Sequence, residues 1–262
     1  MSDPVHLAIE GAVATLTLDR PGAGNTIDLP LARGLLAAAI SCDQDPAIRC
    51  VVLTGAGRLF CGGGDLGALT EAGEALPGFL SELAGTLHMA VSRLMRMEKP
   101  LLVLVNGPAA GAGMSLALAG DVVLAARSAH FTAAYGGVGL SPDGGMSWLL
   151  PRLVGLRRAQ EIILTNRRVG AEEAERIGLV TRTVDDAALA GEGAELAARL
   201  AASATRALGL ARGLLADSLG AGLETQLERE ARSIAEAGRS PDGREGIQAF
   251  LARRKPDFTG RI

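Results

Sequence analysis

Alternating and periodic apolar positions predict strands and helices in the first 150 residues and mainly helices after them. Residues 5–10 and 12–18 alternate apolar and polar side chains around Gly11, which predicts a hairpin of two strands. Two short uncharged runs, 50–53 and 101–105, are typical of strands buried in a parallel sheet, and a third strand is expected at 121–125.

Helix signals fill the spaces between these strands and then dominate. Asp28 is a candidate N-cap for a helix that begins near Pro30, and a second helix is predicted over 76–97, where Pro100 stops it. The segment 128–150 reads as mostly loop. Beyond Pro151, helical patterns cover 155–164, 171–177, 186–202, 204–218, 221–237 and 241–252, with a short strand near 180–184. The order of elements predicts an α/β core with a helical C-terminal part.

Composition narrows the class of protein. The chain has 262 residues, of which 48% are hydrophobic, so a folded globular state is expected, with one large domain or one domain and a small appendage. The formal net charge is -3, and the sequence pI is about 5.7. Such a balance provides no basic field for nucleic acid, and we expect no nucleic-acid partner.

Cysteines and apolar runs bear on compartment and membrane association. Cys42, Cys50 and Cys61 show no metal-ligand spacing, so no metal site is expected and a reduced, cytoplasmic setting is the simplest interpretation. The N-terminus lacks the basic and apolar regions of a signal peptide. The uncharged segment 101–120 has the length of a membrane span, but its glycines and Pro108 favour a strand, a loop and a helix, so no membrane partner is expected.

Two glycine-rich segments are candidates for binding an anionic group. The first, Phe-Cys-Gly-Gly-Gly-Asp-Leu at 60–66, follows a predicted strand and leaves backbone N–H groups unobstructed, with Asp65 as a candidate helix cap; a plain tight turn is the alternative. The second, 106–115, leaves a buried strand and enters a helix, and close helix packing is its alternative explanation. Because the two strands are expected to be neighbours, these loops could converge on one developing oxyanion.

Asp143 is the third candidate. It is the only carboxylate between Ser128 and Ser147, and an isolated acid among apolar neighbours is suited to acid–base catalysis. The alternative is an ordinary turn at Pro-Asp-Gly. His88 lies on an apolar helix face, so we expect a packed core histidine. Cys61 has no base beside it and is not expected to act as a nucleophile.

Together these segments resemble the crotonase superfamily, the enoyl-CoA hydratases/isomerases. Asp19-Arg20-Pro21 with Asn25 resembles the opening motif of that family, the two glycine loops resemble its oxyanion-hole loops, and 171–180 resembles its late helix–strand signature. The resemblance implies a ββα-spiral core over residues 1–200 and a helical trimerisation region over 201–262. It also implies an acyl-CoA thioester substrate, no separate cofactor because coenzyme A is part of that substrate, and a homotrimer or a dimer of trimers.

The resemblance also assigns site residues by position. The oxyanion donors fall on the N–H groups of Gly62 and Ala112, and the two glutamates of typical hydratases fall at Ser115 and Tyr135, where no carboxylate is present. Asp143 falls where dienoyl-CoA and ring-epoxyphenylacetyl-CoA isomerases carry an aspartate, and residues 141–145, 150–152 and 244–260 are most similar to the latter group. Substrate contacts are expected from Cys61, Gly63, Gly64, Asp65, Leu66, Gly111, Ser115 and Tyr135.

The addition of water to a double bond is a task that the hydratases of this family divide between two carboxylates. A proton shift needs only one base, so one carboxylate beside an oxyanion hole suits a proton shift better. We therefore expect an acyl-CoA isomerase that moves a double bond, or rearranges a ring epoxide, through a thioester enolate, with Asp143 as acid and base. Three alternatives stay open: an enoyl-CoA hydratase, an acyl-CoA hydrolase with Asp143 as nucleophile, and a non-catalytic acyl-CoA-binding homologue.

Overall fold

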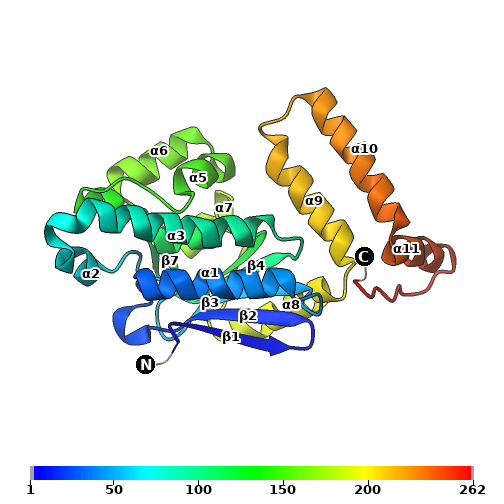
Figure 1. Ribbon diagram of the computed structural model, residues 1–262, viewed down its shortest axis with the longest axis horizontal. Coiled ribbons are helices and arrows are strands. Elements are labelled where there is room, and N and C mark those ends of the chain that lie inside the picture. The colour runs from blue at the N-terminus through cyan, green and yellow to red at the C-terminus, as the bar shows by residue number, and fades with distance from the viewer. Residues whose placement is uncertain (1–2, 261–262) are drawn as a thin grey trace.

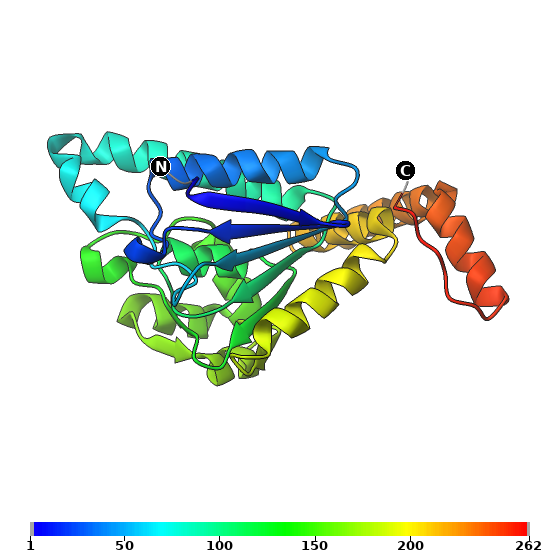
Figure 2. The same cartoon turned by 90° about the horizontal axis from the view of Figure 1, so that it is seen from below.

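A twisted six-stranded sheet forms the centre of the computed structural model, which describes residues 3–260. Its strand order is β1-β2-β3-β4-β6-β9, and only the β1–β2 pair is antiparallel (Figure 2). The strands are β1 (Val5–Glu10), β2 (Val13–Leu18), β3 (Cys50–Gly55), β4 (Leu101–Val105), β6 (Val122–Ala126) and β9 (Arg182–Val184). The predicted hairpin, buried parallel strands and α/β class are confirmed.

Helices cover both faces of this sheet. On one side α1 (Leu29–Gln44) packs against α3 (Leu76–Arg96), and on the other α8 (Leu189–Ala201) crosses the parallel strands. The start of α1 is the predicted one, because the Asp28 side chain accepts a hydrogen bond of 2.9 Å from the Leu31 N–H. The end of α3 lies four residues before Pro100, also as predicted.

A small second sheet lies beside the first and was not predicted. It joins β5 (Ala109–Ala110), β7 (His130–Thr132) and β8 (Arg168–Gly170). The neighbouring helices are α4 (Ala112–Leu118), α5 (Met146–Val154), α6 (Leu156–Thr165) and α7 (Ala171–Arg176). The prediction of loop over 128–150 is therefore partly wrong, because the segment contains β7, a 3-10 turn at Tyr135–Val138 and the first residues of α5.

The last three helices extend from one end of the core (Figure 1). They are α9 (Thr205–Ser218), α10 (Leu223–Arg239) and α11 (Pro241–Leu251), within two residues of the predicted bounds. No residue of α10 is buried. Large apolar side chains are exposed along this extension, at Leu215, Leu219, Leu223, Leu227, Ile234, Ile247 and Phe250.

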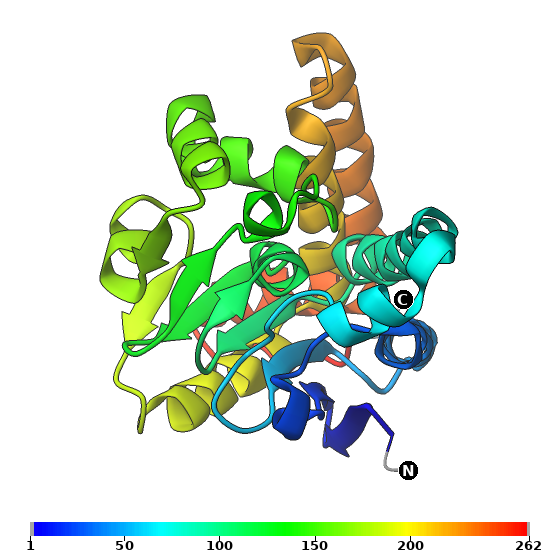
Figure 3. The same ribbon diagram turned by 90° about the vertical axis from the view of Figure 1, so that its left-hand side faces the viewer.

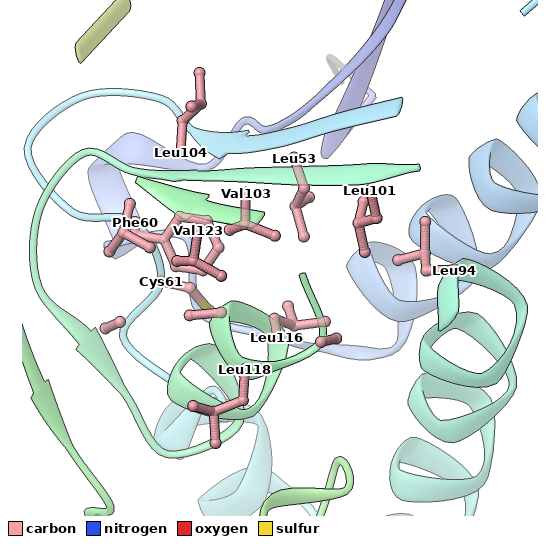
Figure 4. Packing of buried hydrophobic residues seen from close by; sticks show 14 of the residues in the cluster. Leu53, Phe60, Cys61, Leu94, Leu101, Val103, Leu104, Leu116, Leu118 and Val123 are labelled. Carbon is pink, nitrogen blue, oxygen red and sulfur yellow. The ribbon is translucent and has the colours of Figure 1, made fainter. Parts of the chain in front are cut away.

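Helix α4 is the most deeply buried helix near the sheet edge, since all seven of its residues are buried. Figure 4 shows Leu116 and Leu118 of this helix beside Cys61, below the strands that carry Leu53 and Val103. A Cβ atom on Gly113 would lie 2.2 Å from the Cys61 carbonyl oxygen, so only glycine allows α4 to lie this close to the loop at 60–66.

The uncharged segment 101–120 thus forms β4, a loop with β5, and α4, as the sequence predicted. Among residues 3–260, no helix combines the length and hydropathy needed to cross a membrane.

Candidate active site

The two glycine loops meet at one edge of the sheet. β3 and β4 are parallel neighbours, with Val51 paired to Leu101, so the loops that follow them start side by side. Backbone hydrogen bonds join them: the Phe60 N–H donates to the Pro108 carbonyl at 3.1 Å, and the Ala110 N–H donates to the Cys61 carbonyl at 3.0 Å. Figure 3 shows this side of the molecule, with α2 (Leu66–Glu71) and α3 beside the loops.

A cavity of about 270 Å³ lies at this junction. Aliphatic side chains form much of its wall, including Leu69, Leu80, Leu83, Leu87 and Val138. Eight of the predicted site residues line it together: Gly62, Gly63, Gly64, Leu66, Gly111, Ala112, Tyr135 and Asp143.

Three predicted contact residues, Cys61, Asp65 and Ser115, do not line this cavity. The Cys61 thiol is fully buried and donates to the Asn25 carbonyl at 3.1 Å, and burial raises its pKa to about 12. Ser115 is also fully buried. Its hydroxyl donates to the Asp143 carbonyl at 2.9 Å, and a Cβ on Gly144 would lie 2.8 Å from the Ser115 Cβ.

Asp65 stabilises the glycine loop at 60–66 from outside the cavity. Its carboxylate accepts from the Ala68 N–H at 3.2 Å, which caps α2 as predicted, and pairs with Arg20 at 3.1 Å. Burial opposes ionisation here, but the Ala68 N–H, Arg20 and Thr26 outweigh it and hold the pKa of Asp65 below its usual value.

Asn25 explains the opening motif in structural terms. Its buried side-chain amide donates to the carbonyls of Ala56 and Leu59, at 2.9 and 2.8 Å, and its carbonyl oxygen accepts from the Arg20 N–H. These bonds hold the segment between β3 and the glycine loop. Arg20 and Asn25 therefore position the loop, while neither lines the cavity.

The unbonded backbone N–H groups at the cavity differ from the predicted pair of oxyanion donors at one position. The Gly62 N–H donates to the Gly24 carbonyl at 2.9 Å, which contradicts its assignment as a donor to substrate. By contrast, the N–H groups of Gly64 and Ala112 make no hydrogen bond within the described part of the chain.

Local geometry explains why these two groups are free. Gly64 lies opposite Ile27 in an isolated parallel bridge. The two hydrogen bonds of this bridge are made by its neighbours, because the Ile27 N–H donates to the Gly63 carbonyl and the Asp65 N–H donates to the Ile27 carbonyl. The N–H of Gly64 itself therefore points away from Ile27. Ala112 is the first residue of α4, where an N–H has no acceptor within its own helix. The cavity thus holds two free backbone donors on adjoining loops, an arrangement suited to a thioester oxygen that gains negative charge.

Asp143 presents its two carboxylate oxygens to different surroundings. Its Oδ1 accepts from the Tyr135 hydroxyl at 2.6 Å, whereas Oδ2 accepts no hydrogen bond within residues 3–260. Burial and the nearby charge of Asp143 raise the pKa of Tyr135, so the phenol remains a donor. With 30% of its side chain exposed, Asp143 can meet both substrate and solvent.

His88 lies beside the site, in a neighbouring surface groove, and the sequence did not reveal this position. It was expected in the core, but half of its side chain is exposed, and its Nε2 accepts from the Gly144 N–H at 3.0 Å. A ring nitrogen that accepts this bond carries no proton, and the same Nε2 lies 3.8 Å from Asp143 Oδ2. The sequence did offer one signal for this position. His88 follows Leu80 and Ala84 at intervals of four residues, so it lies on the face of α3 from which these two residues line the cavity.

No group of three or more His, Cys, Asp or Glu side chains within residues 3–260 is placed to hold a metal ion.

Comparisons with known proteins agree with the fold and with the family resemblance seen in the sequence. Residues 8–261 match the family model described as enoyl-CoA hydratase/isomerase. The chain is 41% identical over 261 residues to 1,2-epoxyphenylacetyl-CoA isomerase of Escherichia coli, with 97% of each chain covered. It is also 34% identical to an enoyl-CoA hydratase from Polaromonas sp. JS666, whose crystal structure matches with a TM-score of 0.93 over 97% of this chain and 99% of the other. The chain therefore belongs to the enoyl-CoA hydratase/isomerase family and has the crotonase fold.

Proposed function

We propose that the protein is an acyl-CoA isomerase that moves a carbon–carbon double bond through a thioester enolate. The observation that carries this proposal is Asp143, the only carboxylate among the described residues that line the cavity. Its Oδ1 is held by Tyr135 and its Oδ2 is open. One open carboxylate oxygen can remove a proton from one carbon and return it to another.

The free N–H groups of Gly64 and Ala112 supply the second requirement. With a 3-enoyl thioester bound, its carbonyl oxygen accepts from both groups, and Asp143 takes a proton from the α-carbon. The electron pair of the broken C–H bond moves onto the thioester oxygen as an enolate, which the two donors stabilise. Asp143 then returns the proton to the γ-carbon, and the product is the conjugated 2-enoyl thioester.

The aliphatic wall supports an apolar acyl group as the substrate. Leucine side chains from α2 and α3 form one side, while Val138 and Leu140 form another. A ring epoxide of an arylacetyl thioester is the second substrate to test, since a relative with 41% identity carries the name of such an isomerase.

The alternatives fit this cavity less well. A hydratase that shares its task between two carboxylates would need a second acid, but Ser115 is buried and Tyr135 serves as donor to Asp143. A hydrolase with Asp143 as nucleophile would need a base for water. The Nε2 lone pair of His88 is already occupied by the Gly144 N–H.

The test uses 3-enoyl-CoA in heavy water, followed by mass spectrometry. The wild type should form 2-enoyl-CoA and wash deuterium into the α- or γ-carbon. Asp143→Asn should abolish both while leaving CoA thioester binding, measured by calorimetry, nearly unchanged, because the amide keeps the shape and loses the base. Formation of 3-hydroxyacyl-CoA from 2-enoyl-CoA at equal rates in both proteins would instead support the hydratase. Binding without any turnover in the wild type would support a non-catalytic homologue.

A further inference from the structure

One nitrogen atom of His88 faces both a hydrogen-bond donor and a hydrogen-bond acceptor. Its Nε2 lies 3.0 Å from the Gly144 nitrogen, which donates, and 3.8 Å from Asp143 Oδ2, which can only accept when ionised. The two neighbours demand opposite protonation states of the same ring atom. A bare nitrogen bonds to Gly144, and a protonated nitrogen bonds to Asp143.

The neutral state keeps the acid–base residue in place. Gly144 has a φ of 61°, and a Cβ on it would lie 2.8 Å from the Ser115 Cβ, so this tightly packed backbone has little freedom to turn its N–H to another acceptor. The bond from this N–H to His88 holds the peptide that joins Asp143 to Gly144. Tyr135 donates to Oδ1, and Oδ2 accepts no hydrogen bond within residues 3–260.

Protonation reverses this arrangement. The Nε2 atom then carries a hydrogen, and the Gly144 N–H loses its acceptor. Asp143 Oδ2 is the acceptor nearest to the new donor, and histidine changes its charge between about pH 5 and pH 8. An ion pair at Oδ2 occupies the oxygen that removes the proton from substrate.

The surroundings of His88 allow this exchange. Tyr135 and Asp143 lie on the cavity side. A surface groove on the other side includes Arg93 and Arg96 of α3 and Asp43 of α1, and Asp43 already pairs with Arg93 at 2.7 Å. The carboxylate open to a protonated ring is therefore Asp143, and the half-exposed ring receives its proton from solvent.

We infer that His88 is a positioning residue that switches the isomerase off in acid. Neutral His88 holds the Gly144 peptide and leaves Asp143 Oδ2 free, and protonated His88 binds Oδ2. The kinetic test of this inference rests on the proposed function. The spectroscopic test depends only on which ring nitrogen of His88 carries the proton.

The kinetic test compares pH profiles of kcat/KM for the wild type, His88→Gln and His88→Leu. Glutamine can accept from the Gly144 N–H but does not titrate, so His88→Gln should keep much of the activity and lose the acidic limb in the histidine range. Leucine removes the acceptor and does not titrate, so His88→Leu should lower kcat about tenfold at pH 8, with KM nearly unchanged, and should also lose the acidic limb. His6→Gln, a change at an exposed histidine of β1, is the matched control and should keep the wild-type profile. Coincident limbs in the wild type and His88→Gln would overturn the inference.

The spectroscopic test needs no turnover. In protein labelled with ¹⁵N-histidine, the His88 signals, identified by their absence in His88→Gln, should show the Nδ1–H tautomer at pH 8 and titrate to the imidazolium in acid. An Nε2–H tautomer at pH 8 would overturn the inference even if the isomerase activity is confirmed. An Nδ1–H tautomer in a protein without isomerase activity would refute the proposed function and retain only the bond from the Gly144 N–H to His88.

Discussion

Single hydrogen bonds decide which of three consecutive glycines can serve a substrate carbonyl. The Gly62 N–H donates to the Gly24 carbonyl, whereas the Gly64 N–H makes no hydrogen bond within the described residues. The sequence shows three equivalent glycines, and the difference arises from a partner 38 residues earlier in the chain. No local pattern contains that information. Asp143 could be predicted, because it is the only carboxylate between Ser128 and Ser147, whereas Tyr135 was placed at the site only by the family resemblance.

The first prediction separates the two glycines. Gly64→Pro removes the free donor and should lower kcat by about 10²–10³, the usual cost of one oxyanion donor. Gly64→Ala keeps the N–H, and its Cβ would meet no atom within 4 Å, so it should remain close to wild type. Steady-state kinetics of both variants checks this. Equal losses in the two variants would assign the effect to the side chain and contradict the donor role.

Tyr135 gives the second prediction. Tyr135→Phe removes the 2.6 Å bond to Asp143 Oδ1 and should lower kcat about tenfold, with CoA thioester binding retained. Because burial raises the pKa of Tyr135, the phenol stays protonated, and the ratio of wild-type to variant rates should be constant between about pH 7 and pH 9. A ratio that changes over this range would contradict a simple donor role.

At the scale of elements, helices with a clear apolar period were predicted well and short strands were not. The bounds of α3 and of α9 to α11 agree with the periodicity, because each presents an apolar stripe over three or more turns. β5 and β8 have two and three residues, too few to show any alternation. α5 was missed because it starts after two glycines and contains Pro151, signals that normally mark loops.

The third prediction concerns the junction of α2 with the opening motif. Asp65→Ala removes the cap of α2 and the partner of Arg20, and should lower the free energy of unfolding by about 1–2 kcal/mol at pH 7. The pKa of Asp65 is lowered in the folded state, so its contribution is fully present above the ordinary value of 3.8 and is lost as the pH falls below it. Urea unfolding at pH 7 and at pH 3 should therefore show a smaller difference in acid. A difference in the free energy of unfolding between the wild type and Asp65→Ala that is larger at pH 3 than at pH 7 would contradict the lowered pKa of Asp65.

At the scale of the whole molecule, the helices α9 to α11 leave apolar surface exposed at one end of the core (Figure 1). Sequence periodicity predicts these helices, but no residue of the described chain covers their exposed apolar side chains. Exposed apolar surface of this kind is normally buried by association. We propose a trimer or a dimer of trimers, as the family resemblance implies.

The fourth prediction tests this assembly. Light scattering at micromolar concentration should give the mass of a trimer or hexamer. The double change Leu227→Glu and Ile234→Glu places charges on exposed apolar positions of α10 and should shift the protein toward monomers. Glu230→Gln on the same helix is the control. A wild-type protein that is monomeric under these conditions would refute the assembly.

The three buried cysteines can report how often the folded protein opens locally, because their thiols react only when they become exposed. Burial raises the pKa of Cys42 to about 11 and those of Cys50 and Cys61 to about 12, so almost no thiolate exists in the closed protein. Thiol reagents attack the thiolate, and modification must therefore wait for local or global unfolding. Cys61 belongs to the first glycine loop and lies directly against α4, whereas Cys42 and Cys50 lie in α1 and β3. The labelling rate at Cys61 relative to the other two cysteines would thus report how often the glycine loop at 60–66 separates from α4, and a thioester bound in the cavity should slow this labelling.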